Sequence, residues 1–211
     1  MEWLQISLGL YQANCYILVK EDQSCLIFDP GDEAEKLLHF IQQKQLKPLA
    51  IILTHAHCDH IGAVDALRDA YHIPVYIHEQ EADWLVDPVL NGSSEYEITK
   101  HISGKHADYL IKSEQEMMIA AFRFQILETP GHSPGGISIY FPEANFVITG
   151  DALFNGSIGR SDFPGGNYNQ LIKSIHEKLL VLPEETIVLP GHGGKTTIGR
   201  EMDSNPFLHG F

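Results

Sequence analysis

The sequence predicts a mixed α/β or α+β fold in which sheets are covered by helices. Strand and helix signals alternate over the first third of the chain, and strand follows strand from Glu116 onward. The segment Tyr168–Leu180 places leucines and isoleucines along one helix face, as an amphipathic helix does. Strand meanders with flanking amphipathic helices are typical of sheets that carry helices on their faces.

The first 85 residues contain short apolar, β-branched or aromatic runs and longer runs of helical periodicity. The expected strands are Trp3–Leu8, Cys15–Val19, Cys25–Asp29, Leu49–Thr54 and Val75–His78. The expected helices are Asp32–Gln43, Ile61–Tyr71 and Glu79–Leu85. Residues 87–106 have weak periodicity and read as a long loop, a kind of segment that often carries function.

The second half of the chain begins with strands and ends with helices. The expected strands are Met117–Ala120, Phe122–Leu127, Ile137–Phe141, Phe146–Thr149 and Ile187–Pro190. A glycine-rich stretch, Asp151–Asn167, precedes the helix Tyr168–Leu180, and a last helix is expected over Thr196–Asn205. Because there is no linker, repeat or low-complexity segment, we expect a single domain over residues 1–211.

Composition restricts the partners and the compartment. The 211 residues are 44% apolar and 20% charged, as in ordinary globular proteins, and the formal net charge is −14. Such an acidic surface repels phosphate backbones, so we expect no nucleic-acid partner. Three cysteines, the lack of a signal-peptide pattern and the lack of an apolar run of about 18 residues predict a cytoplasmic protein without a membrane partner.

The strongest chemical signal is the segment His55-Ala56-His57-Cys58-Asp59-His60, directly after an expected strand. It contains four good metal ligands within six residues. Imidazole nitrogen and carboxylate oxygen are the donors that Zn²⁺ takes in sites that keep an open position. Histidine is common here, with 12 in the chain, but a chance origin of this grouping is improbable.

Three further candidates each follow a glycine at the end of an expected strand. They are His132 in Thr-Pro-Gly-His, Asp151 in Thr-Gly-Asp and His192 in Pro-Gly-His. Glycine permits the tight turn and close backbone approach that a crowded metal site needs. Each one alone is a weak signal, because a glycine–histidine pair is more often a plain loop. Their joint occurrence with the first motif is what predicts a shared cleft.

These motifs, in this order and at these intervals, resemble those of the metallo-β-lactamase superfamily, from Asp29 to His192. The segment Leu153–Asn167 resembles the glyoxalase II-like, or hydroxyacylglutathione hydrolase-like, branch, in its short bacterial form without a C-terminal helical domain. The resemblance implies a four-layer αββα sandwich with the metals at one edge of the two sheets.

The resemblance also implies a role for each candidate residue. One metal would be held by His55, His57 and His132, and the other by Asp59, His60 and His192. Asp151 would bridge the two metals, and Asp59 and Asp151 would be the catalytic carboxylates. Asp29 would support the ligands, as metal histidines commonly require, although Asp29-Pro30-Gly31 is also a plain turn sequence.

Two metals about 3.5–4 Å apart can share a water, lower its pKa and provide a nucleophile at neutral pH. We therefore expect two Zn²⁺ ions per chain, with iron or manganese possible, and hydrolysis of a thioester such as S-lactoylglutathione. Arg160 would contact the anionic part of such a substrate, and the alternative is a solvated or salt-bridged surface arginine.

Other activities stay open at this point. A persulfide dioxygenase on the same fold uses one Fe²⁺ on two histidines and one aspartate, and His55, His132 and Asp151 match those positions. A lactonase or a phosphodiesterase is a further alternative. Gly193 and Gly194 stand where full-length glyoxalase II has Glu-Tyr, which leaves the substrate in doubt. Typical β-lactamases have Cys or Ser at the position of Asp151, so we do not expect an antibiotic-degrading enzyme.

Overall fold

The computed structural model describes residues 1–95 and 101–209. The chain divides into two compact units, Met1–Ile111 and Lys112–Phe211, and each has its own sheet and its own helices. The predicted mixed α/β architecture, with sheets that carry helices, is therefore confirmed, and each of the two main sheets has six strands. That all 211 residues act as one domain stays a prediction.

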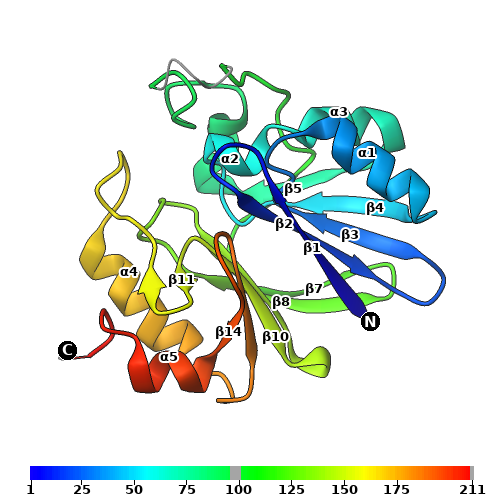
Figure 1. Cartoon of the computed structure of the whole chain (residues 1–211). Helices are drawn as coiled ribbons and strands as arrows, with labels where there is room; N and C mark the ends of the chain where they lie inside the picture. The colour runs from blue at the N-terminus through cyan, green and yellow to red at the C-terminus, as the bar shows by residue number, and fades with distance from the viewer. Residues whose placement is uncertain (96–100, 210–211) are drawn as a thin grey trace. The chain divides into compact units, whose positions relative to one another are not determined.

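Unit 1 contains a mixed sheet with the strand order β1-β2-β3-β4-β5-β6 (Figure 1). Its strands are β1 (Glu2–Leu8), β2 (Ala13–Val19), β3 (Ser24–Phe28), β4 (Lys47–Ile52), β5 (Val75–His78) and β6 (Tyr109–Ile111). Its helical elements are α1 (Ala34–Gln43), α2 (Cys58–Ile61), α3 (Val64–Tyr71) and the 3₁₀ segment η1 (Glu79–Leu85). Strands β3, β4, β5 and β6 run parallel, so their carboxyl ends lie at one edge of the sheet.

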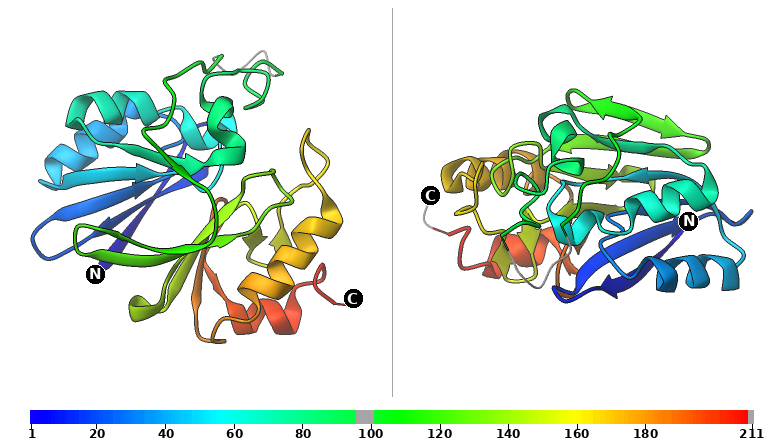
Figure 2. Two further views of the ribbon diagram at one scale, coloured as in Figure 1. Left: turned by 180° about the vertical axis from the view of Figure 1, so that it is seen from behind. Right: turned by 90° about the horizontal axis from the view of Figure 1, so that it is seen from above.

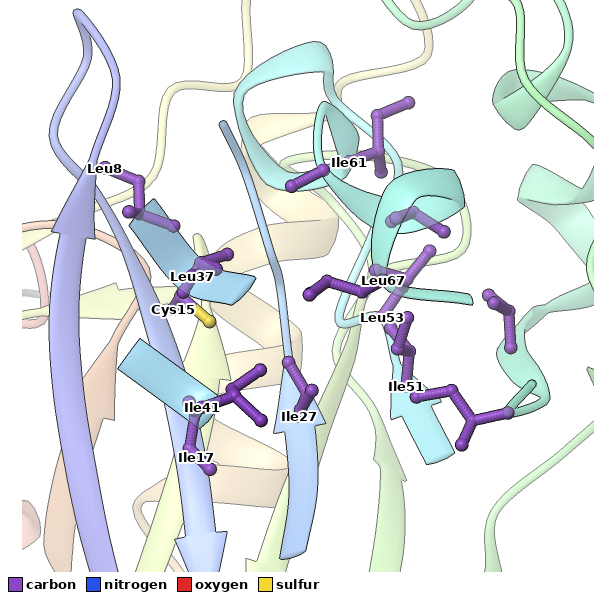
Figure 3. Close-up of a cluster of buried hydrophobic side chains, with 14 of the residues drawn as sticks. Leu8, Cys15, Ile17, Ile27, Leu37, Ile41, Ile51, Leu53, Ile61 and Leu67 are labelled. Carbon is purple, nitrogen blue, oxygen red and sulfur yellow. The ribbon is translucent and has the colours of Figure 1, made fainter. Parts of the chain in front are cut away.

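One face of this sheet carries the helices. Leu37 and Ile41 of α1 and Leu67 of α3 pack in one fully buried cluster with alternate residues of the strands, among them Ile17 and Ile27 (Figure 3). Alternation is required because successive side chains of a strand point to opposite faces. This packing holds the strands in place, and with them the sheet edge at which β3, β4 and β5 end.

Unit 2 has the sheet order β14-β13-β10-β9-β8-β7. Its strands are β7 (Gln115–Ile119), β8 (Phe122–Glu128), β9 (Ile137–Phe141), β10 (Phe146–Gly150), β13 (Ile187–Pro190) and β14 (Thr196–Thr197), and β11 (Leu153–Phe154) pairs with β12 (Ser157–Ile158) as a separate hairpin. Its helical elements are η2 (Pro142–Ala144), α4 (Tyr168–Ser174), the π-helical turn η3 (Ile175–Leu179) and α5 (Ile198–Ser204). Helices α4 and α5 lie side by side (Figure 2), and they pack in one apolar cluster with Val147 and Val188 of the sheet.

Several expected elements differ from the structure in their bounds. The expected helix Ile61–Tyr71 is two helices, because α2 ends at Ile61 and α3 begins only at Val64. The expected helix Asp32–Gln43 begins at Ala34, because Glu33 takes a left-handed conformation. The expected helix Thr196–Asn205 begins with the two-residue strand β14. Strands β6, β11 and β12 were not expected from the sequence, because their two or three residues are too few for a periodic signal.

The long loop of residues 87–106 is partly described. Residues 87–95 form turns close to α2, and 101–106 return toward β6, while 96–100 lie outside the described residues. Within the described part of the chain, no helix is long and apolar enough to cross a membrane.

Candidate metal centre

The first group of candidate ligands lies at the carboxyl ends of β3 and β4 in unit 1. Because these strands are parallel neighbours, Asp29 after β3 and His55 after β4 come to the same sheet edge. Asp29, His55 and His60 each offer one ligand atom, and these atoms lie within 4.8 Å of one another. The one-turn helix α2 begins at Cys58 and carries Asp59 and His60.

Asp29 orients two of these histidines through hydrogen bonds. Its Oδ1 accepts the backbone N–H of Thr54 at 2.8 Å, and its Oδ2 accepts the Thr54 hydroxyl at 2.6 Å. That hydroxyl in turn accepts from Nδ1 of His55 at 3.0 Å, since its own proton is given to Asp29. Nδ1 of His60 lies 3.1 Å from Oδ2 of Asp29. Because Nδ1 of each ring faces Asp29 or Thr54, each ring presents the lone pair of its Nε2 as the donor for a metal.

The glycine after Asp29 allows α2 to approach. A Cβ on Gly31 would collide with the backbone carbonyl of Asp59. The N–H of Gly62 donates to the carbonyl of Gly31 at 2.8 Å, so the approach is fixed by a hydrogen bond. The Pro-Gly turn that the sequence analysis treated as a possible plain turn thus places Asp59 and His60.

The second group comes from three strand ends of unit 2. His192 and Asp151 follow β13 and β10, which are parallel neighbours, and the N–H of Gly191 donates to the carbonyl of Gly150 at 2.7 Å. His132 follows β8, which runs in the same direction as β10 because β9 lies antiparallel between them. The three side chains therefore meet at one edge of the sheet, as the sequence predicts.

A single oxygen of Asp151 faces two histidines. Oδ2 lies 3.5 Å from Nε2 of His132 and 3.5 Å from Nε2 of His192. Nδ1 of His132 donates to the carbonyl oxygen of Arg160 at 2.7 Å, so its Nε2 presents a lone pair toward the carboxylate. Two lone pairs that face each other fit a cation between them. Two ligands of one tetrahedral zinc ion, with bonds of about 2.0–2.2 Å, lie roughly 3.4 Å apart.

In unit 1, the distance between two candidate donor atoms also matches the spacing of two ligands of one zinc ion. Nε2 of His60 lies 3.7 Å from Oδ2 of Asp59, while Nδ1 of His60 is directed to Asp29. The residues present therefore fit a metal ion by donor type, by spacing and by the orientation of the rings.

Aromatic rings line the described parts of both groups. The ring centroid of Trp84 lies 5.4 Å from that of His57, and the ring centroid of Phe154 lies 6.1 Å from that of His192, with the two rings perpendicular. Phe163 stands edge-on to His132 at 6.2 Å. Phe154 is half-buried beside the candidate ligand His192.

Arg160, the expected substrate contact, has its guanidinium in solvent. Its Nε and Nη2 donate to the two carboxylate oxygens of Asp162 at 2.9 and 2.8 Å, and its charged group lies 4.2 Å above the Phe163 ring. This ion pair lowers the pKa of Asp162 through the hydrogen bond from Arg160. Its backbone carbonyl, which no sequence pattern indicates, orients His132.

Sequence reasoning missed three buried residues that contact the first motif. They are Glu81, Trp84 and Asn91. Glu81 reads in the sequence as an acidic residue of a surface helix, and no local pattern sets it apart.

Comparison with known proteins identifies the family. The sequence model of the metallo-beta-lactamase superfamily matches residues 8–192. The chain is 52% identical over 211 residues to the probable metallo-hydrolase YqgX of Bacillus subtilis, with 100% of this chain and 99% of that protein covered. It is 37% identical to hydroxyacylglutathione hydrolase GloC of Haemophilus influenzae, with 97% and 96% covered.

Solved structures show the same fold. The BLEG-1 B3 metallo-beta-lactamase superposes with a TM-score of 0.96 at 52% identity, over 99% of this chain and 100% of that one. TTHA1623 in a di-iron-bound form superposes with a TM-score of 0.87 at 40% identity, over 97% of this chain and 100% of that one. The chain therefore belongs to the metallo-beta-lactamase superfamily, and its histidine and aspartate clusters are those of a metallo-hydrolase.

Proposed function

We propose that this chain hydrolyses a thioester of an anionic thiol with two metal ions at one centre. The proposed ligands are the seven predicted from the sequence: His55, His57, Asp59, His60, His132, Asp151 and His192. The observation that carries the proposal is the carboxylate of Asp151, whose Oδ2 stands at metal-ligand spacing from two separate imidazoles. One oxygen in that position suits a bridge between two ions.

When bound, the metals would supply a water of lowered pKa and would polarise the substrate carbonyl. The chain's own residues orient the ligands. Asp29 and Thr54 direct Nε2 of His55 and His60, and the carbonyl of Arg160 directs Nε2 of His132. The balanced reaction is thioester plus water to carboxylic acid plus thiol, with cleavage of the carbon–sulfur bond.

We propose zinc as the metal at both positions. The HxHxDH segment supplies nitrogen donors that suit zinc as well as iron. The di-iron form of TTHA1623 makes iron the principal competing choice. Manganese is a lesser alternative, because imidazole-rich sets suit it poorly.

A thioester of glutathione is the proposed substrate, for two reasons. The first is the 37% identity with the hydroxyacylglutathione hydrolase GloC over nearly the whole chain. The second is Arg160, a solvent-exposed cation whose backbone contacts a proposed ligand. We further propose a small-molecule partner in the cytoplasm and no nucleic-acid or membrane partner, because the net charge of −14 disfavours anionic surfaces.

A second candidate function is hydrolysis of a β-lactam amide. The observation that favours it is the 52% identity with a structure named as a B3 metallo-beta-lactamase. This likeness runs against the sequence-based expectation drawn from the aspartate at position 151. A water activated at this centre would suit attack on a β-lactam carbonyl as well as on a thioester carbonyl.

The test combines metal content with activity on competing substrates. Protein purified without added metal is analysed for elements per chain, and thiol release from S-lactoylglutathione is followed before and after strong chelation. We expect close to two metals per chain and thioesterase activity that chelation abolishes. Faster turnover of a β-lactam would favour the second function, and a single iron with rapid O₂ uptake on glutathione persulfide would overturn the hydrolase.

A further inference from the structure

A fully buried carboxylate lies directly behind the first metal motif. Glu81 of η1 has no exposed surface, and its Oε2 accepts the backbone N–H of Ala56 at 2.6 Å. Ala56 is the residue between His55 and His57. A buried carboxylate is costly unless hydrogen bonds satisfy it, so this position calls for an explanation.

Strand order brings Glu81 to this place. Strand β5 is the parallel neighbour of β4, so residues that follow β5 reach the same sheet edge as His55. Glu81 follows β5 by three residues, and η1 is interrupted there, since Glu81 has φ −119° and ψ 15°. The carboxylate therefore enters the loop after β4 from a kink in the adjoining segment.

Two other residues that follow β5 contact the next two positions of the motif. The Trp84 ring stands 5.4 Å from that of His57, and the Asn91 carbonyl accepts the N–H of Cys58 at 2.9 Å. Three consecutive residues, Ala56 to Cys58, are thus held by Glu81, Trp84 and Asn91. All three of these supporting residues are buried.

Asn91 is itself fixed by the long loop. Its side-chain amide donates to the carbonyls of Trp84 and Ile102 at 2.8 and 2.9 Å. The described parts of the loop over residues 87–106 therefore close on the segment behind the metal motif. This gives a physical role to a loop for which the sequence indicated only a general functional importance.

We propose that Glu81 is a positioning residue of the metal centre, which holds the peptide between His55 and His57 so that both imidazoles keep their ligand geometry. Trp84 and Asn91 support the same segment. The inference rests on the proposed function, because it takes His55 and His57 to be metal ligands. Glu81 acts through the backbone of Ala56 and is not a ligand in this assignment.

The experiment is a zinc titration with a readout other than activity. Trp84 reports on the neighbouring His57 through its fluorescence, and Trp3→Phe removes the only other tryptophan. In this background, the fluorescence of Trp84 follows zinc binding, and competition with a chromogenic chelator gives the zinc affinity. Both are measured for the parent, for Glu81→Ala and for Glu81→Gln. Thermal unfolding of the zinc-free proteins shows that each variant is folded.

The matched control is Glu201→Gln. Glu201 is also fully buried and also accepts a backbone N–H, that of Gly156 at 2.9 Å, and its side-chain partners Thr196 and Asn205 belong to unit 2 as well. We expect Glu81→Ala to weaken zinc binding about tenfold, as changes behind metal ligands commonly do. Glu81→Gln should weaken it about threefold, because a neutral acceptor makes a weaker hydrogen bond. Glu201→Gln should stay within about twofold.

Two results would overturn the inference: a folded Glu81→Ala protein with parental zinc affinity, or equal losses in Glu81→Gln and Glu201→Gln. If Glu81→Ala does not fold, the comparison of the two glutamine variants decides. The proposed function fails separately, if the parent binds no zinc or if His57→Ala binds zinc as tightly as the parent.

Discussion

Unit 1 carries four of the proposed ligands within six residues, whereas unit 2 takes three from the ends of three strands. In unit 1 the ligands are adjacent in sequence, so their geometry depends on residues that hold one short loop, such as Asp29 and Glu81. In unit 2 each ligand follows a different strand, so the sheet itself brings them together. The first arrangement needs support behind a loop, and the second needs correct strand order.

This contrast separates two kinds of sensitivity. A change in the supporting residues of unit 1 should alter ligand geometry while the sheet persists. A change at Asp151 in unit 2 should remove a ligand atom that both neighbouring histidines face.

Asp151→Ala should have the largest effect, because one carboxylate oxygen of Asp151 faces two histidines that are proposed as ligands. We expect metal content to fall from about two ions to less than one, and kcat for the thioester to fall about a thousandfold or more, since metal stabilisation of the reacting carbonyl contributes several kcal/mol. Elemental analysis and steady-state kinetics measure both. Asp203→Ala, an exposed acidic residue of α5, is the control. Two tightly held metals in Asp151→Ala would show that the bridging role is wrong.

Gly31→Ala tests how closely α2 must approach in unit 1. The added Cβ would meet the carbonyl of Asp59, so the helix must shift. We expect the free energy of unfolding in urea to fall by about 2–3 kcal/mol, as for other overpacked sites. Gly194→Ala, where the added Cβ meets nothing within 4 Å, should change it by less than about 0.5 kcal/mol. Equal free energies of unfolding for the two variants would show that the stability of unit 1 does not depend on the close approach of α2.

The pair Arg160–Asp162 tests substrate binding in unit 2. Arg160→Ala should raise KM for a glutathione thioester about tenfold with kcat within twofold, because the contact is remote from the carbonyl. Asp162→Ala releases the guanidinium from its ion pair and should lower KM about threefold, in line with the small worth of an exposed pair. A neutral thioester should respond to neither change. If Arg160→Ala slows the hydrolysis of neutral and anionic thioesters alike, Arg160 has a structural role and does not bind the substrate.

Buried thiols of unit 1 should make stability depend on alkaline pH. Burial raises the pKa of the Cys25 thiol to about 12 from its ordinary value of 9.0, so the unfolded chain loses this proton first as pH rises. The stabilisation from the thiol is thus complete below pH 9 and is lost between about pH 9 and 12, by about 1.4 kcal/mol per unit. Denaturation in urea at pH 8 and pH 10 should show the decline, and Cys25→Ala should reduce it. An unchanged slope in Cys25→Ala would assign the decline to other groups.

Sequence patterns predicted regular elements well where one periodicity persists. Val75–His78, Ile137–Phe141 and Ile187–Pro190 agree with the structure at both ends. Elements fixed by tertiary contacts were not predicted, such as the hairpin of β11 and β12. The helix Tyr168–Leu180 is α-helical only to Ser174 and continues as a π-helical turn, a change that residue periodicity does not report.

The candidate ligands could be named from sequence because strand ends, glycines and histidines recur together. The support around them could not. Glu81 looks like any surface acid until the order of β4 and β5 places it behind Ala56. The contact from Arg160 to His132 uses a backbone carbonyl, which every residue has. Sequence therefore indicates which side chains are candidate ligands, while the fold determines what orients them.

The backbone conformation of Asp29 lowers the stability of the fold at a position whose carboxylate orients two candidate ligands. Its φ is 48°, in the left-handed region that side-chain-bearing residues enter at a cost of about 1–2 kcal/mol. Glycine would relax that strain, but it would remove the carboxylate that Thr54 and His60 contact. The chain thus keeps a less stable residue at the position that aims two imidazoles. A search for thermostabilising substitutions should leave this position unchanged, because a substitution that raised the melting temperature there would remove the hydrogen bonds that orient the two imidazoles.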